Sequence, residues 1–410
     1  MLEIRGTYAT AVCYAKVIDE RAMEQIRAMC DCALTEGSRI RIMPDVHAGT
    51  GCTIGTTMTV TDKVCPNIVG VDIGCGMYTV LLSDRTLDFE RIDRAVHSIP
   101  SGMRVWETAA ADFDLQGLRC FSSLHDLSRL KCSLGTLGGG NHFVEIDRNA
   151  DGDCCLVIHS GSRGLGTQVA GYYQDLAVDH LIGKGRLARE RSALIRELKA
   201  QGRETEIEEA LRMLRGKQAD ASGAVPPDMC WLEGDDMADY LHDVEICQRF
   251  AKKSREIMAQ IILEQGGLTA LESFHTIHNY IDTREMILRK GAIAAHKGEK
   301  VLIPINMRDG SVLAIGKGNL DWNESAPHGA GRIMSRAEAK ASIDLEAYRK
   351  AMEGIYSTSV SERTLDEAPM AYKSLSDIVD VIGESVDIID VMKPVYNFKA
   401  DDEEPLWKKT

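Results

Sequence analysis

The chain has 410 residues, of which 44% are hydrophobic and 27% charged, and 48 Lys and Arg stand against 62 Asp and Glu. This length allows two domains or one elaborate domain, and the composition is that of a folded globular protein. The net charge of −14 excludes a protein that binds nucleic acid through a general coat of positive charge. Any nucleic-acid site must therefore be local.

The cysteines and the first residues indicate a reducing compartment. Twelve Cys show no regular paired spacing, unlike the disulfide framework of a secreted protein. The start of the chain lacks the basic stretch and apolar run of a signal peptide, and no run of about 18 apolar residues occurs. We expect a cytoplasmic protein without a membrane segment.

The first hundred residues predict short strands and two helices. Residues 7–17 are rich in Thr, Tyr, Val and Ala and predict a strand, and 19–34 predict a helix. A second helix is expected over Phe89–His97. Between the helices, β-branched runs that alternate with Gly and Pro predict three strands: Thr53–Val60, Ile68–Val71 and Met77–Leu82.

The middle of the chain predicts a buried strand and then helix. Cys155–His159 reads as a strand that ends in the loop SGSRGLG. Residues 184–217 hold ten basic and six acidic residues, so we expect a solvated helical excursion over 183–230 rather than an RNA-contacting arm. A helix over Asp236–Gln265 follows. The last third predicts two strands and two helices: Val301–Ile305, Ser311–Ile315, Ala337–Met352 and Leu375–Val391.

Histidines carry the main chemical signal. Of the 11 His, six lie in short segments rich in Gly, Asn and Asp: His47, His142, His159, His275, His278 and His328. One such histidine usually has a structural role, but six in loop-like contexts are hard to assign to core packing. Histidine is the commonest metal ligand, so the set predicts a metal site.

The segment VGVDIGCGM places Asp72 and Cys75 three residues apart in a glycine-flanked turn. A carboxylate and a thiolate can then face one point, and this donor pair suits a transition metal better than magnesium. A buried Cys that happens to end a strand is the structural alternative.

Three further segments present histidines. GGGNHF carries His142 and LVIHSGSRG carries His159, whose imidazoles could complete a metal site. HTIHNY carries His275 and His278 at a spacing that would share a helical face, but the HExxH pattern of zinc proteases is absent. Neighbouring polar side chains are suited to phosphate oxygens: Asn141, Ser160, Ser162 and Arg163.

Two segments could act on a substrate directly. MPDVHAGTGCTIG carries Asp45 and His47 on one side of an extended stretch. Asp45 could orient a ligand or activate a nucleophile, or it could only stabilise a turn. SAPHGAGR sets His328 before two glycines that allow a close backbone approach, and a histidine so placed can attack phosphorus.

Absent motifs exclude several enzyme classes. The chain has no GxxxxGK[ST] loop and no Cys-x-x-Cys pair, and GTGCTIG has one residue too many for a dinucleotide fingerprint. Ordinary kinases, P-loop GTPases and dehydrogenases are therefore poor candidates.

Between about residues 39 and 400, the chain resembles the RtcB family of GTP- and manganese-dependent RNA ligases. The matching motifs, in order, are MPDVHAGTGCTIG, VGVDIGCGM, LGTLGGGNHFVEI, HSGSRGLG, HNY, RKGAI, SAPHGAGRIMSR and APMAYKS. The resemblance implies a mixed α/β fold (α+β) with a central metal and nucleotide cleft. We expect a single catalytic domain over 1–410 that contains the excursion at 183–230, because a domain boundary would separate ligands that must share ions.

The activity that this resemblance implies is RNA ligation in tRNA splicing or RNA repair. A 2′,3′-cyclic phosphate or 3′-phosphate end would be joined to a 5′-hydroxyl end. His328 would attack the α-phosphorus of GTP, hold GMP as a phosphoramidate and pass it to the RNA 3′-phosphate. The 5′-hydroxyl would then displace GMP from this RNA-ppG intermediate. Whether an activating partner protein is needed stays open.

The family motifs also imply the site residues. Two Mn²⁺ ions would be held by Asp72, Cys75, His142, His159 and His278, with Cys75 bridging the ions. Asp45 would orient a neighbour or handle a proton. GTP would contact Asn141, His142, Phe143, Val144, Glu145, His278, Asn279, Pro304, Ile305, Asn306, Met307, Ser311, His328, Gly329, Ala330, Gly331, Tyr372 and Lys399.

The sequence departs from the family pattern at three places. Pro304–Gly310 replaces the usual Pro-Gly-Ser-Met-Gly, so we expect Ile305 to reshape the guanosine pocket and Arg308 to add a charge nearby. Ile277 replaces the first His of the usual His-His-Asn, and residues 400–410 extend beyond the lysine that usually lies at the end. We expect a divergent bacterial-type branch that retains the nucleotide chemistry, with its RNA partner open.

Two other functions compete with the ligase. A manganese-dependent RNA cyclic phosphodiesterase or phosphatase would keep the metal residues without a guanylylated His328. The intact SAPHGAGR segment favours the ligase over this enzyme. A non-catalytic RNA-binding or metal-storage protein is the third candidate, and the retention of the nucleophile together with all five ligands argues against it. Thiolate and imidazole ligands would also accept zinc or cobalt.

Overall fold

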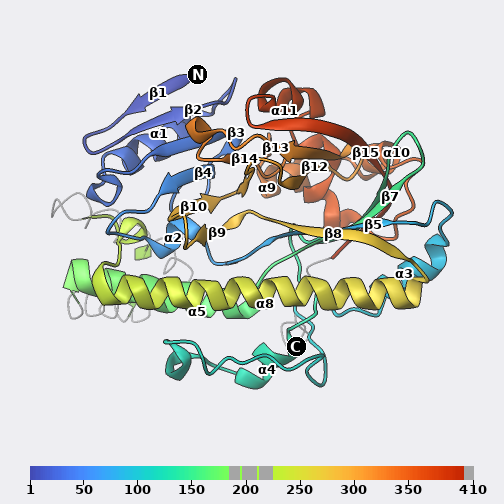
Figure 1. Ribbon diagram of the computed structural model, residues 1–410, viewed down its shortest axis with the longest axis horizontal. Coiled ribbons are helices and arrows are strands. Elements are labelled where there is room, and N and C mark those ends of the chain that lie inside the picture. Colours follow the sequence, from blue (N-terminus) through green and yellow to red (C-terminus); the bar gives the residue numbers. More distant parts are fainter. Residues whose placement is uncertain (184–193, 196–209, 212–224, 401–410) are drawn as a thin grey trace.

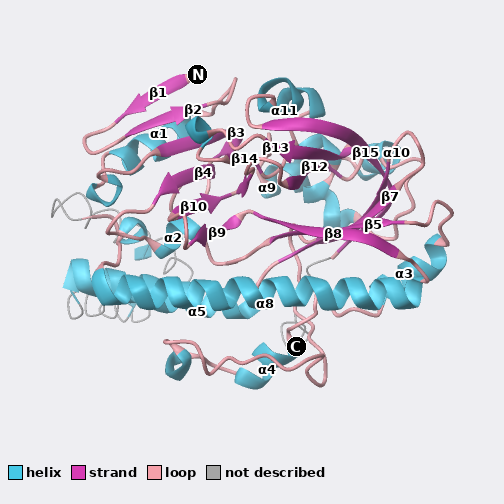
Figure 2. Cartoon of the chain, viewed as in Figure 1, coloured by secondary structure: helices cyan, strands magenta, loops and turns pink. Residues whose placement is uncertain are grey.

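The computed structural model describes residues 1–183, 194–195, 210–211 and 225–400, which form a mixed α/β fold (Figures 1 and 2). Two β-sheets lie on one side of a long helix that runs along the long axis of the molecule (Figure 1). The predicted fold class is confirmed.

The first sheet has six strands in the order β1-β2-β3-β4-β10-β9, and only β2 and β3 are parallel. Its strands are β1 (Leu2–Arg5), β2 (Thr10–Cys13), β3 (Ile40–His47), β4 (Ile54–Thr59), β9 (Asn279–Asp282) and β10 (Ile287–Lys290). Helix α1 (Glu20–Cys30) is capped by the Asp19 side chain, and its buried Ile26 and Met29 share one core with Ile40 of this sheet.

The second sheet has seven antiparallel strands in the order β12-β13-β15-β6-β7-β5-β8. They are β5 (Gly76–Leu82), β6 (Phe143–Arg148), β7 (Cys154–Ser160), β8 (Ala270–Ile277), β12 (Lys300–Asn306), β13 (Gly310–Gly316) and β15 (Val386–Lys399). The sheet curls so far that its two edge strands meet. The backbone N–H of Leu302 in β12 donates to Thr276 Oγ1 in β8 at 3.2 Å. Met77, Val157 and Leu302 form a small apolar core between the facing strands.

Short elements join the two sheets. β11 (Ala292–Ala294) and β14 (Ser325–Pro327) form a two-stranded antiparallel pair, and only His278 separates β8 from β9. The shorter helices are α2 (Pro66–Val69), α3 (Phe89–His97), α4 (Leu127–Cys132), α5 (Arg163–Val178), α9 (Arg336–Ser342), α10 (Leu345–Ala351) and α11 (Leu375–Ile382). Short 3₁₀ helices are η1 (Ala33–Thr35), η2 (Phe121–Ser123), η5 (Pro227–Met229), η6 (Leu320–Trp322), η7 (Glu362–Glu367) and η8 (Pro369–Ala371), and η3 (Asp179–Gly183) is a short π-helix.

Helix α8 (Gly234–Gly266) supports both sheets from below, with α5 beside it and α4 on its far side (Figure 1). Its buried residues recur every three or four positions and so form one face: Met237, Tyr240, Val244, Cys247, Phe250, Ala251, Ser254, Arg255, Met258 and Ile262. The helix ends at Gly266, and the next residue, Gly267, adopts a left-handed conformation that favours glycine.

Several predicted elements are confirmed, with ends shifted by a few residues. Strand β5, helix α3 and strand β7 occupy the expected positions, as do the elements predicted over Thr53–Val60, Val301–Ile305, Ser311–Ile315 and Asp236–Gln265. The strand expected over 7–17 shrinks to β2, and the helix expected over 19–34 shrinks to α1.

Two predictions near the site are wrong because local signals outweigh composition. The strand expected over Ile68–Val71 is replaced by helix α2, which begins at Pro66 and is ended by Gly70 with φ of 94°. The expected loop SGSRGLG forms only in part, because helix α5 already begins at Arg163. His275 and His278 lie on β8 and just after it, not on a helical face.

Two long helices predicted near the end of the chain are also corrected. The helix over Ala337–Met352 is broken into α9 and α10, because Asp344 caps a new helix by accepting the Ala347 N–H. The helix over Leu375–Val391 ends at Ile382, and the β-branched residues from Val386 onward form β15.

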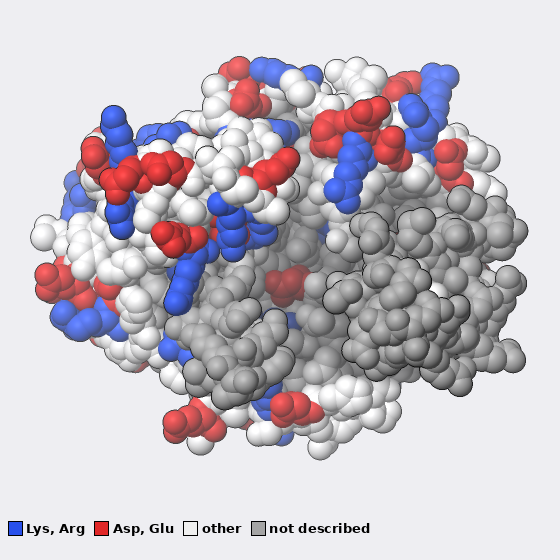
Figure 3. Space-filling view, turned by 180° about the vertical axis from the view of Figure 1, so that it is seen from behind, with Lys and Arg blue, Asp and Glu red and all other residues white. Residues whose placement is uncertain are grey.

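The predicted excursion over 183–230 falls largely outside the described residues, as do residues 401–410. Among the described helices, none is both long and apolar enough to cross a membrane. Figure 3 shows acidic and basic side chains intermingled on one face, so the described part of that face has no continuous basic patch.

Candidate metal and nucleotide site

Four neighbouring strands bring four candidate ligands to one edge of the second sheet. In the order β6-β7-β5-β8, His142 precedes β6, His159 lies near the end of β7, Cys75 precedes β5 and His278 follows β8. Because neighbouring strands are antiparallel, two starts and two ends coincide there.

The sulfur of Cys75 lies at the centre of this cluster. Its Sγ is 3.5 Å from His142 Nε2 and 3.3 Å from His159 Nε2. His159 Nε2 is 3.1 Å from His278 Nε2, and Asp72 Oδ2 is 3.1 Å from His142 Nε2. Two groups that share Cys75 could each hold an ion, with ligand atoms within 4.8 Å of one another: Cys75, His159 and His278, and Asp72, Cys75 and His142.

The hydrogen bonding of His159 fits a metal ligand. Its Nδ1 lies 3.0 Å from the carbonyl oxygen of Asn141, so this nitrogen carries the proton and donates. The neutral ring then directs the lone pair of Nε2 toward Cys75 and His278. Metal-bound imidazoles usually have such an outer partner, and the mixed sulfur, nitrogen and oxygen donors fit a first-row transition ion.

Burial sets the protonation of the cluster. It raises the pKa of Cys75 well above its ordinary value and lowers the pKa of His159 and His278 well below theirs. Burial also acts to raise the pKa of Asp72, but the hydrogen bond and charge of His142 outweigh it and lower that pKa to about 2. Converging lone pairs on neutral imidazoles beside a carboxylate favour a cation.

A third group of possible ligands lies at the surface. Asp282, Glu285 and His296 have ligand atoms close together. Both nitrogens of His296 already face carboxylates, however, at 3.0 Å from Glu285 and 2.7 Å from Glu299. Ion pairing accounts for this group.

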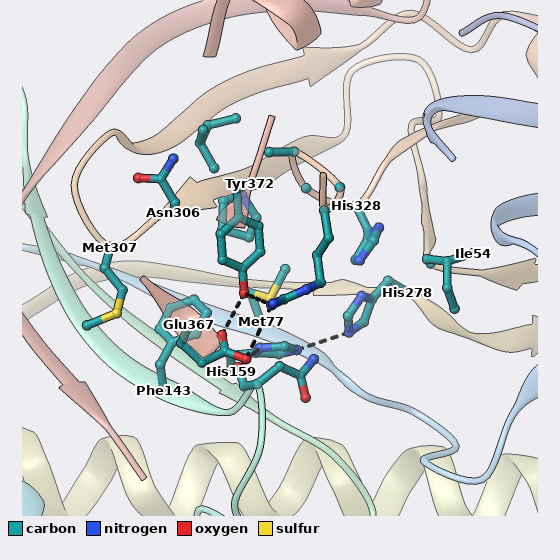
Figure 4. A pocket seen from close by; sticks show the side chains of 18 of the residues that line it. Ile54, Met77, Phe143, His159, His278, Asn306, Met307, His328, Glu367 and Tyr372 are labelled. Atoms are coloured by element: carbon teal, nitrogen blue, oxygen red, sulfur yellow. Dashed lines mark hydrogen bonds and ion pairs between the residues drawn. The ribbon is translucent and has the colours of Figure 1, made fainter. Parts of the chain in front are cut away.

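A buried aspartate orients His328, which directly follows β14. Oδ2 of Asp45 accepts the backbone N–H of His328 at 3.1 Å and faces its Nδ1 at 2.6 Å. A proton on Nδ1 leaves the lone pair of Nε2 available for attack. Gly331, with φ of 75°, lies so close that a Cβ there would collide with the Asp45 carbonyl oxygen. The ring centroids of His328 and His278 are 4.8 Å apart, so the oriented histidine adjoins the cluster (Figure 4).

A cavity of 290 Å³ opens beside these histidines (Figure 4). It is lined by most of the residues expected to contact a nucleotide: Asn141, Phe143, Glu145, His278, Asn279, Pro304, Ile305, Asn306, Met307, His328, Gly329, Ala330, Gly331, Tyr372 and Lys399. Among the other three, His142 lies in the metal cluster, Val144 faces the core on the opposite side of β6, and Ser311 is buried within β13.

Strand β6 gives the cavity its aromatic and acidic wall. Phe143, Glu145 and Asp147 alternate with core residues and therefore share one face. Asn397 donates to Glu145 Oε2 at 2.6 Å, and the Lys399 ammonium lies 5.2 Å from the Phe143 ring centroid. Burial and the neighbouring Asp147 raise the pKa of Glu145 well above its ordinary value.

Glu367 gathers the positive charges of the cavity. Its carboxylate pairs with Lys399 at 2.7 Å and with Arg336 at 2.5 Å, and it accepts the Tyr372 hydroxyl at 2.6 Å (Figure 4). Arg332 donates to the same hydroxyl at 3.0 Å. Burial alone would raise the pKa of Glu367, but Lys399 and Arg336 outweigh it and lower the pKa from 4.5 to about 2.

Replacing Glu367 by glutamine is expected to destabilise the protein in a pH-dependent way. The folded pKa lies below the unfolded one, so the carboxylate stabilises fully above about pH 4.5 and loses this effect as pH falls toward about 2. This difference in pKa corresponds to a contribution of roughly 3 kcal/mol to the free energy of unfolding at neutral pH. Urea unfolding from pH 7 to pH 3 should show the difference between wild type and variant shrinking with acid. A difference that stays constant would contradict the assignment.

The departure at 304–310 has less effect on the cavity than its sequence suggests. Ile305 is 3% exposed and belongs to the core beneath β12, although it still borders the cavity. Arg308, expected to add a charge, instead pairs with Asp309 at 2.9 Å and does not line the cavity. Asn306 caps the turn by accepting the backbone N–H groups of Arg308 and Asp309. Within this segment, residues 304–307 line the cavity and Arg308 does not.

A second cavity, of 520 Å³, reaches the cluster from the side of Asp72. Arg129 and Arg163 lie in its lining together with Gln168. Arg163 is fixed by donating to the carbonyl oxygen of Gly102 at 2.6 Å. The second cavity therefore presents positive side chains beside Asp72. The first cavity presents His328 and the ligands His159 and His278.

Sequence reasoning missed several residues of the site. Glu367 and Arg336 line the first cavity, as does Asn397, and none stands in a glycine loop or beside a histidine. Met77 of β5 also lines the cavity, although it belongs to the small apolar core with Val157 and Leu302 (Figure 4). Arg336 is the last residue of the SAPHGAGRIMSR motif, and its place in that motif was the only signal for it.

The geometry fits one class of protein: an enzyme in which two groups of candidate metal ligands share one cysteine beside an oriented histidine. The chain belongs to the RtcB family, whose model, described as tRNA-splicing ligase RtcB, matches residues 29–118 and 116–400.

Curated relatives agree with this family over most of their length. The chain is 28% identical to RNA-splicing ligase RtcB of Escherichia coli K12 over 402 residues, which covers 88% of this chain and 90% of the relative. It is 27% identical to tRNA-splicing ligase RtcB of Aeropyrum pernix, with 83% of each chain covered. It is also 27% identical to RNA-splicing ligase RtcB of Mycobacterium tuberculosis, over 84% of this chain and 92% of the relative.

Proposed function

We propose that this chain joins an RNA 3′-phosphate or 2′,3′-cyclic phosphate end to a 5′-hydroxyl end, using GTP and two manganese ions. The observation that carries the proposal is the contact between buried Asp45 and His328 beside the ligand cluster. A phosphodiesterase would need the metal residues, but it would not need a histidine held with a free Nε2 at the edge of a cavity.

Asp72, Cys75, His142, His159 and His278 would hold the two ions, with Cys75 a ligand to both. Bound ions of this kind neutralise phosphate charge and polarise the phosphorus centre. They would also allow a protein with a net charge of −14 to handle two polyanions.

The first cavity would take the guanosine nucleotide. Phe143 offers an aromatic face for a purine, and a carboxyl oxygen of Glu145 can accept from the N–H groups on the pairing edge of guanine. Lys399, Arg332 and Arg336 offer positive charge and hydrogen-bond donors.

In the proposed reaction, Nε2 of His328 attacks the α-phosphorus of GTP, and a nitrogen–phosphorus bond forms as pyrophosphate leaves. Asp45 keeps Nδ1 protonated and balances the charge that develops on the ring. Where the RNA end is a cyclic phosphate, water first opens it to a 3′-phosphate and a 2′-hydroxyl. An oxygen of the 3′-phosphate then attacks the same phosphorus and releases Nε2. The 5′-hydroxyl finally attacks the RNA phosphorus and loses its proton to solvent, and GMP leaves with the bonding electron pair.

The second cavity would admit one RNA strand. It reaches the Asp72 group without passing through the nucleotide cavity, and its Arg129 and Arg163 suit phosphate oxygens. Binding there should weaken as salt rises, because phosphate contacts release counterions.

The test is end joining with purified protein, Mn²⁺, GTP and an RNA pair labelled at the 3′-phosphate. We expect a joined product in which the label resists phosphatase, together with consumption of GTP. His328→Ala should not join, whereas His242→Ala, which changes a histidine of α8 outside both cavities, should behave like the wild type. A second RNA pair carries a 2′,3′-cyclic phosphate at its 3′ end, and opening of that phosphate without GTP consumption or joining would replace the ligase with the phosphodiesterase.

A further inference from the structure

Arg255 is a fully buried cation beneath the metal cluster that no step of the proposed reaction uses. It projects from α8, and its side chain is 0% exposed. Among the described residues, no carboxylate forms an ion pair with it. Burying a guanidinium is costly, and packing alone would be served by an apolar side chain. A specific task at this position would explain its presence.

The hydrogen bonds of Arg255 go to the two segments that carry ligands. Its Nη1 donates to the carbonyl oxygen of Gly74 at 2.8 Å and to that of Ser160 at 2.6 Å. Gly74 directly precedes Cys75, and Ser160 directly follows His159. One nitrogen therefore joins the backbone on either side of the Cys75 and His159 pair.

The Gly74 loop is also fixed to the third ligand of that group. The backbone N–H of Gly74 donates to the Asn279 carbonyl oxygen at 2.7 Å, and that of His278 donates to the Cys75 carbonyl oxygen at 2.9 Å. A Cβ on Gly74, whose φ is 77°, would lie 2.9 Å from Gln248 Cα of α8. The loop thus rests on the helix that carries Arg255.

We propose that Arg255 is a positioning residue for one of the two metal groups, the one formed by Cys75, His159 and His278. It sets the spacing of these ligands through two backbone carbonyl groups, and it touches neither substrate nor ligand atoms. The group of Asp72, Cys75 and His142 shares only Cys75 with the first group. This second group depends on Arg255 less, because the Ser162 N–H and His142 contact Asp72 without Arg255. The inference rests on the metal centre of the proposed function.

The test is a titration of metal-free protein with Mn²⁺ and, in parallel, with Co²⁺, whose absorption reports thiolate ligation. Wild type should bind two ions. Arg255→Met should weaken one of them by about 10- to 100-fold, as loss of a partner that orients ligands does, and leave the other within about threefold. Arg255→Lys should recover part of the loss, because both bonds come from one nitrogen and an ammonium can supply both donors.

Two further comparisons separate positioning from general destabilisation. Met258→Ala removes a buried side chain of the same helix that packs in an apolar core and not against the metal ligands. It should lower the stability of the fold and leave the affinities for both metal ions unchanged. His278→Ala removes a ligand of the same group, so adding Arg255→Met should change the remaining site little. Adding Arg255→Met to Asp72→Ala should instead weaken the remaining site by the same factor of about 10 to 100.

Equal weakening of both sites by Arg255→Met, or unchanged affinities, would overturn the inference. If Arg255→Met is too unstable to titrate, Arg255→Lys decides the question. Because the lysine is expected to retain part of the binding, Arg255→Lys protein that binds no ion, beside Met258→Ala protein that binds both, would also contradict the inference. Wild type that binds no ion would overturn both this inference and the proposed metal centre. If the titrations show the expected loss at one site but the protein joins no RNA, the proposed ligase activity is wrong and the inference about Arg255 stands.

Discussion

Replacing Cys75 by alanine is expected to remove both metal ions and with them all RNA joining. Its sulfur is the one atom common to both ligand groups, and it lies 3.3–3.5 Å from two imidazole nitrogens. Each group would keep two ligands, too few to hold a transition ion against water. Loss of several kcal/mol of charge stabilisation predicts a fall in rate of at least about a thousandfold.

Metal content after dialysis, together with the joining rate, measures this effect. Cys13→Ala is the matched control, because Cys13 is equally buried but lies in the core of the first sheet. We expect it to keep both ions. A Cys75→Ala protein that retained two ions would show that the cysteine is not shared.

Replacing Asp45 by asparagine is expected to stop the histidine step while leaving the metals in place. The introduced amide can present an N–H to His328 Nδ1, which would move the ring proton to Nε2 and block its lone pair. Wrong-tautomer substitutions in an aspartate–histidine pair cost about 10⁴-fold in rate.

The rate of GMP transfer to the protein and a Mn²⁺ titration test this pair of expectations. The transfer rate should fall by about 10³- to 10⁴-fold, while two ions still bind with wild-type affinity. A transfer rate within about tenfold of the wild type would contradict the role given to Asp45. Loss of metal binding would show that Asp45 serves the cluster instead.

The sequence indicates most of the candidate ligands and the candidate nucleophile because these residues stand in short motifs. The close approach of Cys75 to His159 and His278 could not be derived from spacing, since it depends on antiparallel strands that start and end at one edge. Likewise, nothing in residues 40–50 indicates that Asp45 contacts His328, because 283 positions separate them.

The failures of sequence reasoning have local physical causes. Ile68–Val71 has strand composition, but Pro66 and Gly70 bracket a helix there. The predicted helix over Leu375–Val391 was too long, because the apolar residues after Ile382 fit the spacing of a helix as well as that of a strand. These residues form strand β15 because they pair with β13 and β6. Glu367 carried no signal at all, since its role depends on Lys399 and Arg336 reaching it from distant segments.

The most direct test of the central claim is covalent transfer of GMP to the protein. Metal-loaded wild type and His328→Ala are incubated with GTP labelled at the α-phosphorus, with labelled ATP as a parallel substrate, and denatured. We predict label on the wild type that survives alkali, is released by acid as GMP, and is absent from the variant. Protein shown to hold both ions that takes up no label from either nucleotide would contradict the account.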